Sequence, residues 1–109
     1  IKTIVELAHS YGMYVIVDEA HGTHFYFNEN MPANAMDSGA DLSAVSMHKT
    51  GGALTQSAAL LSSGTIPPSY IRSIISLLQT TSASYLLLAS LDIARKNFFF
   101  TERKSSGAA

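Results

Sequence analysis

Cysteine is absent from the 109 residues, which excludes a disulfide framework and any metal site built on thiolates. Charge is also scarce, since 14% of the residues are charged and the net charge is −1, so nothing favours nucleic acid as a partner. No basic leader opens the sequence, and no apolar run approaches the roughly 18 to 20 residues that span a bilayer. We therefore predict a soluble, cytoplasmic protein without a membrane segment.

The length and hydrophobic content fit one small globular domain rather than a large enzyme subunit. The hydrophobic fraction is 47%, as in ordinary soluble domains. The sequence begins within a helical pattern at Ile1. Near the other end, a second helical pattern runs to about Asn97 and is followed by a last stretch that ends in polar residues. We expect a central fragment of a longer chain, with one partial domain over residues 1–97 and a ragged or disordered tail over residues 98–109.

Two apolar segments, each followed by polar side chains, predict two strands. Residues 13–17 are continuously apolar and end at Asp18, and they follow a helical pattern that Gly12 can close in the left-handed conformation. Residues 40–46 predict a second short strand, which ends near Lys49. Buried strands flanked by helices are typical of a mostly parallel α/β sheet, where ligands gather at the carboxyl ends of the strands.

The remaining pattern predicts one more strand and two long helices. We expect a loop over residues 24–30, a short helix within residues 32–39 and a third strand over residues 54–62. Pro67 and Pro68 mark the start of a helix, whose buried stripe would consist of Ile71, Ile74, Ile75, Leu77 and Leu78. A further helix is expected over residues 84–96, with Asp92, Arg95 and Lys96 on its exposed side.

Lys49 lies just past the second predicted strand, in Ser46-Met47-His48-Lys49. A lysine at a strand end can simply face solvent, but lysine is seldom placed in a buried cleft without a task. A positioned and partly desolvated amine can attack a carbonyl and form a Schiff base. Ser46 could offer a hydroxyl, and His48 an imidazole N–H, to a phosphate on the same cofactor.

Asp18 is the natural partner for such a cofactor. A carboxylate beside a pyridine nitrogen keeps that nitrogen protonated, and the protonated ring is the electron sink that stabilises a carbanion at the α-carbon of a substrate. Ala20 offers a small apolar face to a flat ring, and His21 could orient Asp18 or contact the cofactor or the substrate. An Asp-Glu pair after a strand can instead cap a turn.

Four segments together resemble the major domain of the bacterial ornithine/lysine/arginine decarboxylases. They are Val17-Asp18-Glu19-Ala20-His21-Gly22-Thr23-His24, residues 41–52, Thr55-Gln56-Ser57, and residues 78–85. The resemblance covers residues 1–97. It implies the aspartate-aminotransferase-like fold, pyridoxal-phosphate fold type I, as an incomplete large domain, with pyridoxal 5′-phosphate as the cofactor.

The resemblance also implies roles for single residues and for the intact protein. They are Lys49 as the Schiff-base lysine, Asp18 as the pyridinium partner, Ala20 against the ring, Ser46 and His48 at the phosphate, and His21 close to the cofactor. The implied reaction is decarboxylation of arginine, lysine or ornithine by a homodimer or larger homo-oligomer, with His48 or Lys49 supplying a proton. The family's phosphate-cradling loop and its outer domain do not occur in these residues, so we expect the 109 residues alone to be inactive and to expose apolar faces.

Three alternatives use the same residues differently. Another enzyme of the same fold type, an aminotransferase or an aldolase, would begin from the same Schiff base. Asp18-Glu19-Ala20-His21 also spells the Mg²⁺-binding box of a DEAH-type helicase, although no Gly-x-x-x-x-Gly-Lys-Ser/Thr loop accompanies it. A zinc site built from His21, His24 and His48 is disfavoured, because Gly22 and the aromatic run after it predict a loop.

Overall fold

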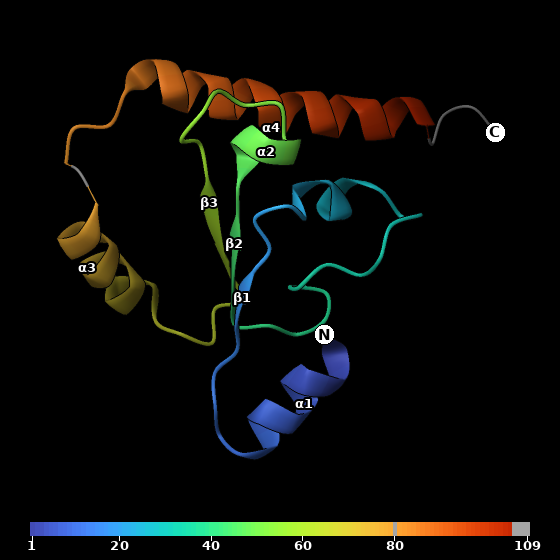
Figure 1. Ribbon diagram of the computed structural model, residues 1–109, viewed down its shortest axis with the longest axis vertical. Helices are drawn as coiled ribbons and strands as arrows, with labels where there is room; N and C mark the ends of the chain where they lie inside the picture. The colour runs from blue at the N-terminus through green and yellow to red at the C-terminus, as the bar shows by residue number, and fades with distance from the viewer. Residues whose placement is uncertain (80, 106–109) are drawn as a thin grey trace.

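The computed structural model describes residues 1–79 and 81–105, which form a small α/β fold as predicted. Figure 1 shows the strands in the middle, α4 across one end of them, α1 at the other end, and α3 set off to one side. The elements in chain order are α1 (Lys2–Ser10), β1 (Ile16–Asp18), the 3-10 helix η1 (Thr23–Phe27), β2 (Leu42–Val45), α2 (Met47–Thr50), β3 (Ala59–Ser62), α3 (Pro68–Leu78) and α4 (Tyr85–Ser105).

The three strands form one mixed sheet in the order β1-β2-β3. β1 and β2 are parallel, with Ile16 opposite Leu42 and Asp18 opposite Ala44. β3 runs antiparallel to β2, so the expectation of a mostly parallel sheet does not describe these three strands. The physical reason is the connection after β2: a parallel return needs a long crossover, usually a full helix, whereas α2 is a single turn.

α1 ends as the sequence predicts. Gly12 has φ +70, and its N–H donates to the carbonyl of His9 at 2.9 Å while the N–H of Met13 donates to that of Ala8 at 3.0 Å. A left-handed glycine closes the helix without the steric cost of a Cβ and lets the next backbone groups satisfy the last carbonyls.

A small apolar core lies between α1 and the sheet. Val5 on α1 is 2% exposed, and Ala35 and Ala40 are fully buried beside it, with Val15 and Val17 packed against them. This cluster packs α1 against β1 and against the segment that leads into β2. On the described residues, no helix is both long enough and apolar enough to cross a membrane.

The first strand is shorter than predicted, and the carboxylate of Asp41 binds the backbone N–H of the residue just before it, Val15. β1 begins at Ile16, not at residue 13. The N–H of Val15 donates to Oδ2 of Asp41 at 2.7 Å, and the carbonyl of Val15 accepts N–H groups from Asp41 and Leu42. The third strand is also short, since β3 begins at Ala59 rather than at residue 54.

Two segments between β1 and β2 differ from the sequence-based expectation. Residues 24–30 were expected to be a loop, but Thr23–Phe27 forms η1, whose first turn closes with the N–H of Phe25 on the carbonyl of Gly22. Residues 35–39 form a turn and residues 32–34 are irregular, instead of the expected short helix. Oδ1 of Asn34 accepts the N–H of Asp37 at 2.8 Å, and such side-chain to backbone bonds favour turns over helices.

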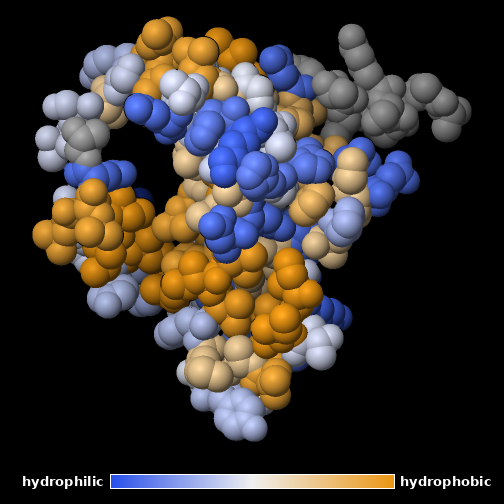
Figure 2. All heavy atoms as spheres, viewed as in Figure 1, coloured by the Kyte–Doolittle hydropathy of each residue, from blue (hydrophilic) through white to orange (hydrophobic). Residues whose placement is uncertain are grey.

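α3 starts at Pro68 as predicted, but its apolar stripe is not buried. None of its residues is buried, and Leu77 and Leu78 are 81% and 83% exposed. The helix is set off from the sheet (Figure 1), and within the stripe only Ile71 and Ile75 are partly covered. Figure 2 shows apolar side chains gathered over α1 and α3, which confirms the expectation that these residues expose apolar faces.

α4 extends beyond the predicted end of its helical pattern. It runs to Ser105, and the ring of Phe98 stacks on that of Phe27 with centroids 4.4 Å apart, a tertiary contact that sequence periodicity does not contain. The exposed acid–base group is confirmed, since Asp92 pairs with Arg95 at 2.9 Å and with Lys96 at 3.4 Å. Residues 106–109 lie outside the described residues, and the division into a domain and a tail stays a prediction.

Asp41 links α1 and the loop after β3 to the segment before β1. It is 2% exposed, and its carboxylate accepts bonds from His9 Nε2 at 2.9 Å, Val15 N at 2.7 Å and Thr65 Oγ1 at 2.6 Å. Burial raises the pKa of Asp41, but the bonds from Thr65, Val15 and His9 together outweigh it and lower the pKa from 3.8 to about 2.

We predict that the intact protein carrying this segment loses stability as the pH falls from about 4 towards about 2, because Asp41 is the stronger acid in the folded state. Asp41→Asn should lower the free energy of unfolding at neutral pH by about 2 kcal/mol and flatten this acid limb. Denaturant titrations over a pH series measure both. If the free energy of unfolding fell equally in the two proteins between about pH 4 and about pH 2, the prediction would be contradicted.

Candidate active site

An open cleft lies where the ends of β1 and β2 meet. Its volume is about 610 Å³, and it is lined by Ile1, Val17, Asp18, Glu19, Ala20, His21, Gly22, Phe25 and Lys49. Because β1 and β2 are parallel, their carboxyl ends lie at the same edge, and the polar residues that follow each strand face one another there. The cleft is the place that the sequence analysis predicts for chemistry.

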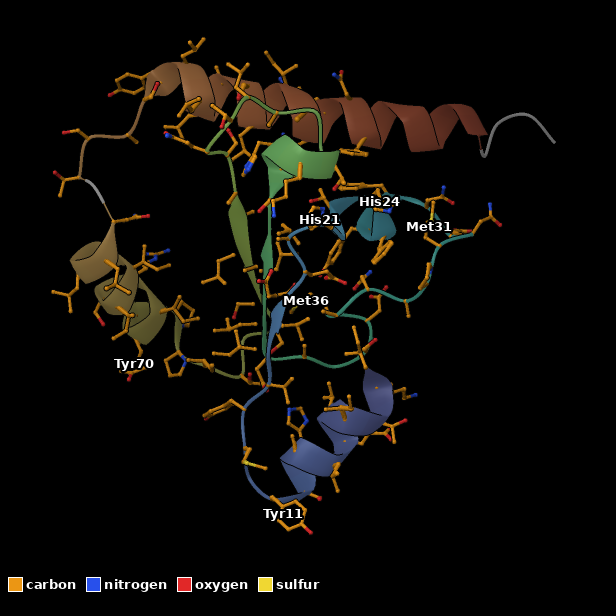
Figure 3. All side chains as sticks on the ribbon, viewed as in Figure 1. Tyr11, His21, His24, Met31, Met36 and Tyr70 are labelled. Carbon is orange, nitrogen blue, oxygen red and sulfur yellow. The ribbon has the colours of Figure 1, made fainter. Side chains whose placement is uncertain are left out.

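Lys49 reaches the cleft from α2, and His21 reaches it from the turn after β1. Nζ of Lys49 lies 3.3 Å from Nε2 of His21. If Lys49 is an ammonium, it donates and Nε2 of His21 must be the unprotonated nitrogen; if Lys49 is a neutral amine, the direction can reverse. Both side chains are exposed. Figure 3 shows His21 and His24 together in the region of η1, next to α2.

Asp18 is held at the end of β1 by its own turn. Its Oδ1 accepts the N–H of Ala20 at 3.0 Å, a side-chain to backbone bond that fixes the first step away from the strand. The side chain remains exposed, so its other oxygen is available to a ligand in the cleft. Asp18 therefore supplies an anchored carboxylate on the strand side of the cleft.

The two phosphate candidates, Ser46 and His48, do not line the cleft. Ser46 precedes α2 without a side-chain capping bond to that helix, and its carbonyl accepts Oγ1–H of the buried Thr23 at 3.2 Å. This bond joins η1 to the start of α2. It thereby fixes the position of α2, and of Lys49 on it, relative to the turn after β1.

His48 is oriented by the loop that leads to β3. Its Nδ1 lies 3.0 Å from the carbonyl oxygen of Ser57, and its backbone N–H donates to the same oxygen at 3.2 Å. A carbonyl only accepts, so Nδ1 carries a proton. Neutral His48 then presents a lone pair at Nε2, and it donates from Nε2 only when the ring is positively charged. The predicted N–H donation to a phosphate thus needs the imidazolium form or a change of partner.

Glu19 is the buried residue of the site whose structural role the sequence analysis missed. Its carboxylate accepts bonds from Tyr26, Ser43 and the N–H of Ala35. Burial and the bond to Glu19 raise the pKa of Tyr26 to about 12. A signal was present in the sequence, since successive strand side chains point to opposite faces, so an Asp18 in the cleft turns Glu19 inward.

The structure thus brings four predicted residues to one cleft and leaves two beside it. Asp18, Ala20, His21 and Lys49 line the cleft. Phe25 also lines it, and no sequence signal singled that residue out. Among residues 1–79 and 81–105, no three histidine, aspartate or glutamate side chains gather closely enough to hold a metal ion.

The fold and cleft define an α/β domain with a lysine and a carboxylate at the shared end of parallel strands. A family model described as "Orn/Lys/Arg decarboxylase, major domain" matches residues 1–106. The chain belongs to this family, which confirms the resemblance stated from the sequence.

Curated relatives agree with this assignment. A protein named arginine decarboxylase from Bacillus subtilis (strain 168) is 56% identical over 97 residues, which are 88% of this chain and 20% of that protein. The arginine decarboxylase of Halalkalibacterium halodurans is 55% identical over 98 residues, 89% of this chain and 20% of that protein. The uncharacterized protein YaaO of Bacillus subtilis is 45% identical over 94 residues, 84% of this chain and 20% of that protein. The chain spans about one fifth of the length of these relatives.

Gly51, which follows α2, provides a test of how tightly Lys49 is held. A Cβ at Gly51 would lie 2.7 Å from the carbonyl oxygen of Met47 and 3.0 Å from its Cα, although φ of −96 suits any residue. We predict that Gly51→Ala displaces α2 and lowers the free energy of unfolding by about 3 kcal/mol.

Gly52→Ala is the matched control for this prediction. Gly52 has φ +75 and nothing within 4 Å of an added Cβ, so its substitution should cost only about 1 kcal/mol of backbone strain. Denaturant unfolding of the intact protein compares the two variants. Equal losses would show that the space beside Met47 does not constrain α2.

Proposed function

We propose that the intact protein is a pyridoxal-phosphate-dependent decarboxylase of a basic amino acid. The observation that carries the proposal is the cleft that both Lys49 and the anchored Asp18 line. Family membership and the relatives named arginine decarboxylase support this class of reaction and favour arginine among the basic substrates.

The residues that line the cleft fit the aldehyde, the pyridine nitrogen and the ring of the proposed cofactor. The cleft supplies an amine for an aldehyde, a carboxylate for a pyridine nitrogen, and the small Ala20 for a flat ring. Near α2, buried hydroxyls of Thr50 and Ser57 have no hydrogen-bond partner among the described residues. Donors left unpaired in this way suit an anionic group.

Each residue has a proposed role in this reaction. When bound, the cofactor supplies a protonated ring that accepts the electron pair left by the departing carbon dioxide. Lys49 would supply the amine that binds the aldehyde carbon, and Asp18 would keep the ring nitrogen protonated. Ser46 and His48 would bind the phosphate, with His48 donating from Nε2 as an imidazolium, and His21 would hold Nζ of Lys49, which lies 3.3 Å from its Nε2. His48 or Lys49 returns a proton to the substrate's α-carbon.

The burial of Glu19 argues for this role of the Asp-Glu pair over a helicase role. In a nucleotide hydrolase the second carboxylate would have to face the attacking water. Glu19 is 7% exposed and accepts bonds from three donors within the protein. Assembly as a homodimer or larger homo-oligomer, a cytoplasmic location and inactivity of the 109 residues alone remain predictions.

Trapping of the cofactor tests the role of Lys49. Borohydride reduction of the intact protein with pyridoxal phosphate should fix the cofactor on the peptide that contains Lys49, because reduction makes the Schiff base permanent. Lys49→Arg should abolish labelling, since a guanidinium cannot form it. Lys96→Arg on exposed α4 is the control and should label normally. Peptide mass spectrometry reads the result, and full labelling of Lys49→Arg would overturn the assignment.

Turnover tests the role of Asp18. Asp18→Ala should still be labelled through Lys49, but it should lose about 100-fold or more in kcat because the ring nitrogen no longer keeps its proton. Steady-state release of carbon dioxide from arginine, lysine and ornithine measures this loss and ranks the substrates. Wild-type kcat in Asp18→Ala would rule out the electron-sink role.

A further inference from the structure

The Glu19 carboxylate joins four segments at the wall of the cleft. It follows β1, and its oxygens accept the Tyr26 hydroxyl of η1 at 2.6 Å, the Ala35 N–H of the turn before β2 at 3.0 Å, and the Ser43 hydroxyl of β2 at 3.1 Å. Ser43 is fully buried and Glu19 is 7% exposed. Three donors within the protein therefore bind the buried carboxylate, which needs such partners away from water.

The backbone of Glu19 is fixed as firmly as its side chain. Its N–H donates to the carbonyl of Ala44 at 3.0 Å, which extends the pairing of β1 with β2 by one residue. Its carbonyl accepts the N–H of Gly22 at 2.8 Å, which closes the turn that carries Ala20 and His21. The backbone of Glu19 thus holds the end of β1 on one side and the turn that carries Ala20 and His21 on the other.

Gly22 shows that the turn is shaped around this side chain. A Cβ at Gly22 would collide with Cγ of Glu19 and lie 3.0 Å from its Cδ. φ at Gly22 is −100, so the backbone conformation does not require glycine. The requirement is space for the Glu19 side chain as it passes beneath the turn towards Tyr26 and Ser43.

We infer that Glu19 is a positioning residue for the proposed decarboxylation: its buried carboxylate holds the turn after β1 so that Asp18 and His21 face Lys49. The inference rests on the proposed function and adds to it a cleft residue whose carboxylate is bound by three donors within the protein. A displacement of about 1 Å at a reacting group can cost up to about 100-fold in rate. Loss of the Glu19 contacts should therefore reduce kcat without preventing the cofactor from binding Lys49.

The intact protein, loaded with pyridoxal phosphate, is compared as wild type and as Glu19→Ala, Glu19→Gln and Glu6→Ala. Glu19→Ala should lower kcat about tenfold with KM changed less than about twofold, since orientation is lost and not substrate binding. Glu19→Gln should stay within about threefold of wild type, because the amide oxygen accepts from Ala35 and the hydroxyls can turn to accept its N–H groups. Glu6, exposed on α1, should change nothing.

A merely stabilising role would leave kcat unchanged well below the melting temperature, and that result in Glu19→Ala would overturn the inference. A kcat for Glu19→Gln as low as that of Glu19→Ala would also overturn it, because charge and not geometry would then matter. Should Glu19→Ala fail to fold, Tyr26→Phe conserves volume and should lower kcat about threefold; wild-type kcat there would refute the inference.

The trapping experiment separates this inference from the proposed function. If borohydride does not fix the cofactor on Lys49 of the wild type, the proposed function fails. If labelling is complete in wild type and variants while kcat stays constant across them, only the role of Glu19 fails.

Discussion

The parallel pairing of β1 with β2 is the constraint on which the rest of the site depends. It places Asp18 opposite Ala44, so the chain after each strand enters the same cleft. β1 has only three residues, and few backbone hydrogen bonds hold it. Buried carboxylates reinforce both ends of the pair, Asp41 just before β2 and Glu19 just after β1, each accepting bonds from at least three donors.

Strand-end reasoning from the sequence predicted where the cleft lies, because it depends on a simple geometric rule. Asp18 and Lys49 follow apolar runs, and strands of the same direction bring such positions together. The rule does not give strand direction, which for β3 depends on the length of the connection after β2. It also does not give strand length, since the carboxylate of Asp41, from a distant part of the sequence, takes the N–H of Val15.

His48 illustrates why side-chain roles are harder to predict than positions. Its place after Ser46-Met47 suggests an N–H donor for phosphate, but the carbonyl of Ser57 receives Nδ1–H instead. That carbonyl belongs to the segment before β3, which the sequence pattern predicts as part of a strand. In a strand, the carbonyl groups of this segment would bind a neighbouring strand instead of His48. The tautomer of neutral His48 thus follows from a loop conformation, with Gln56 at φ 65, that no local pattern indicates.

Lys49 and His21 are exposed, and this exposure bears on the proposed decarboxylation. Stabilising a carbanion through the cofactor ring is most effective where water is excluded, because fixed dipoles then act at low dielectric. The described residues leave the cleft open and leave apolar side chains such as Leu7 and Leu77 uncovered, at 60% and 81% exposure. We infer that other polypeptide covers both in the intact protein. In the proposed function, the described segment would supply the positions of Lys49 and Asp18, and the surrounding protein would supply the dry site.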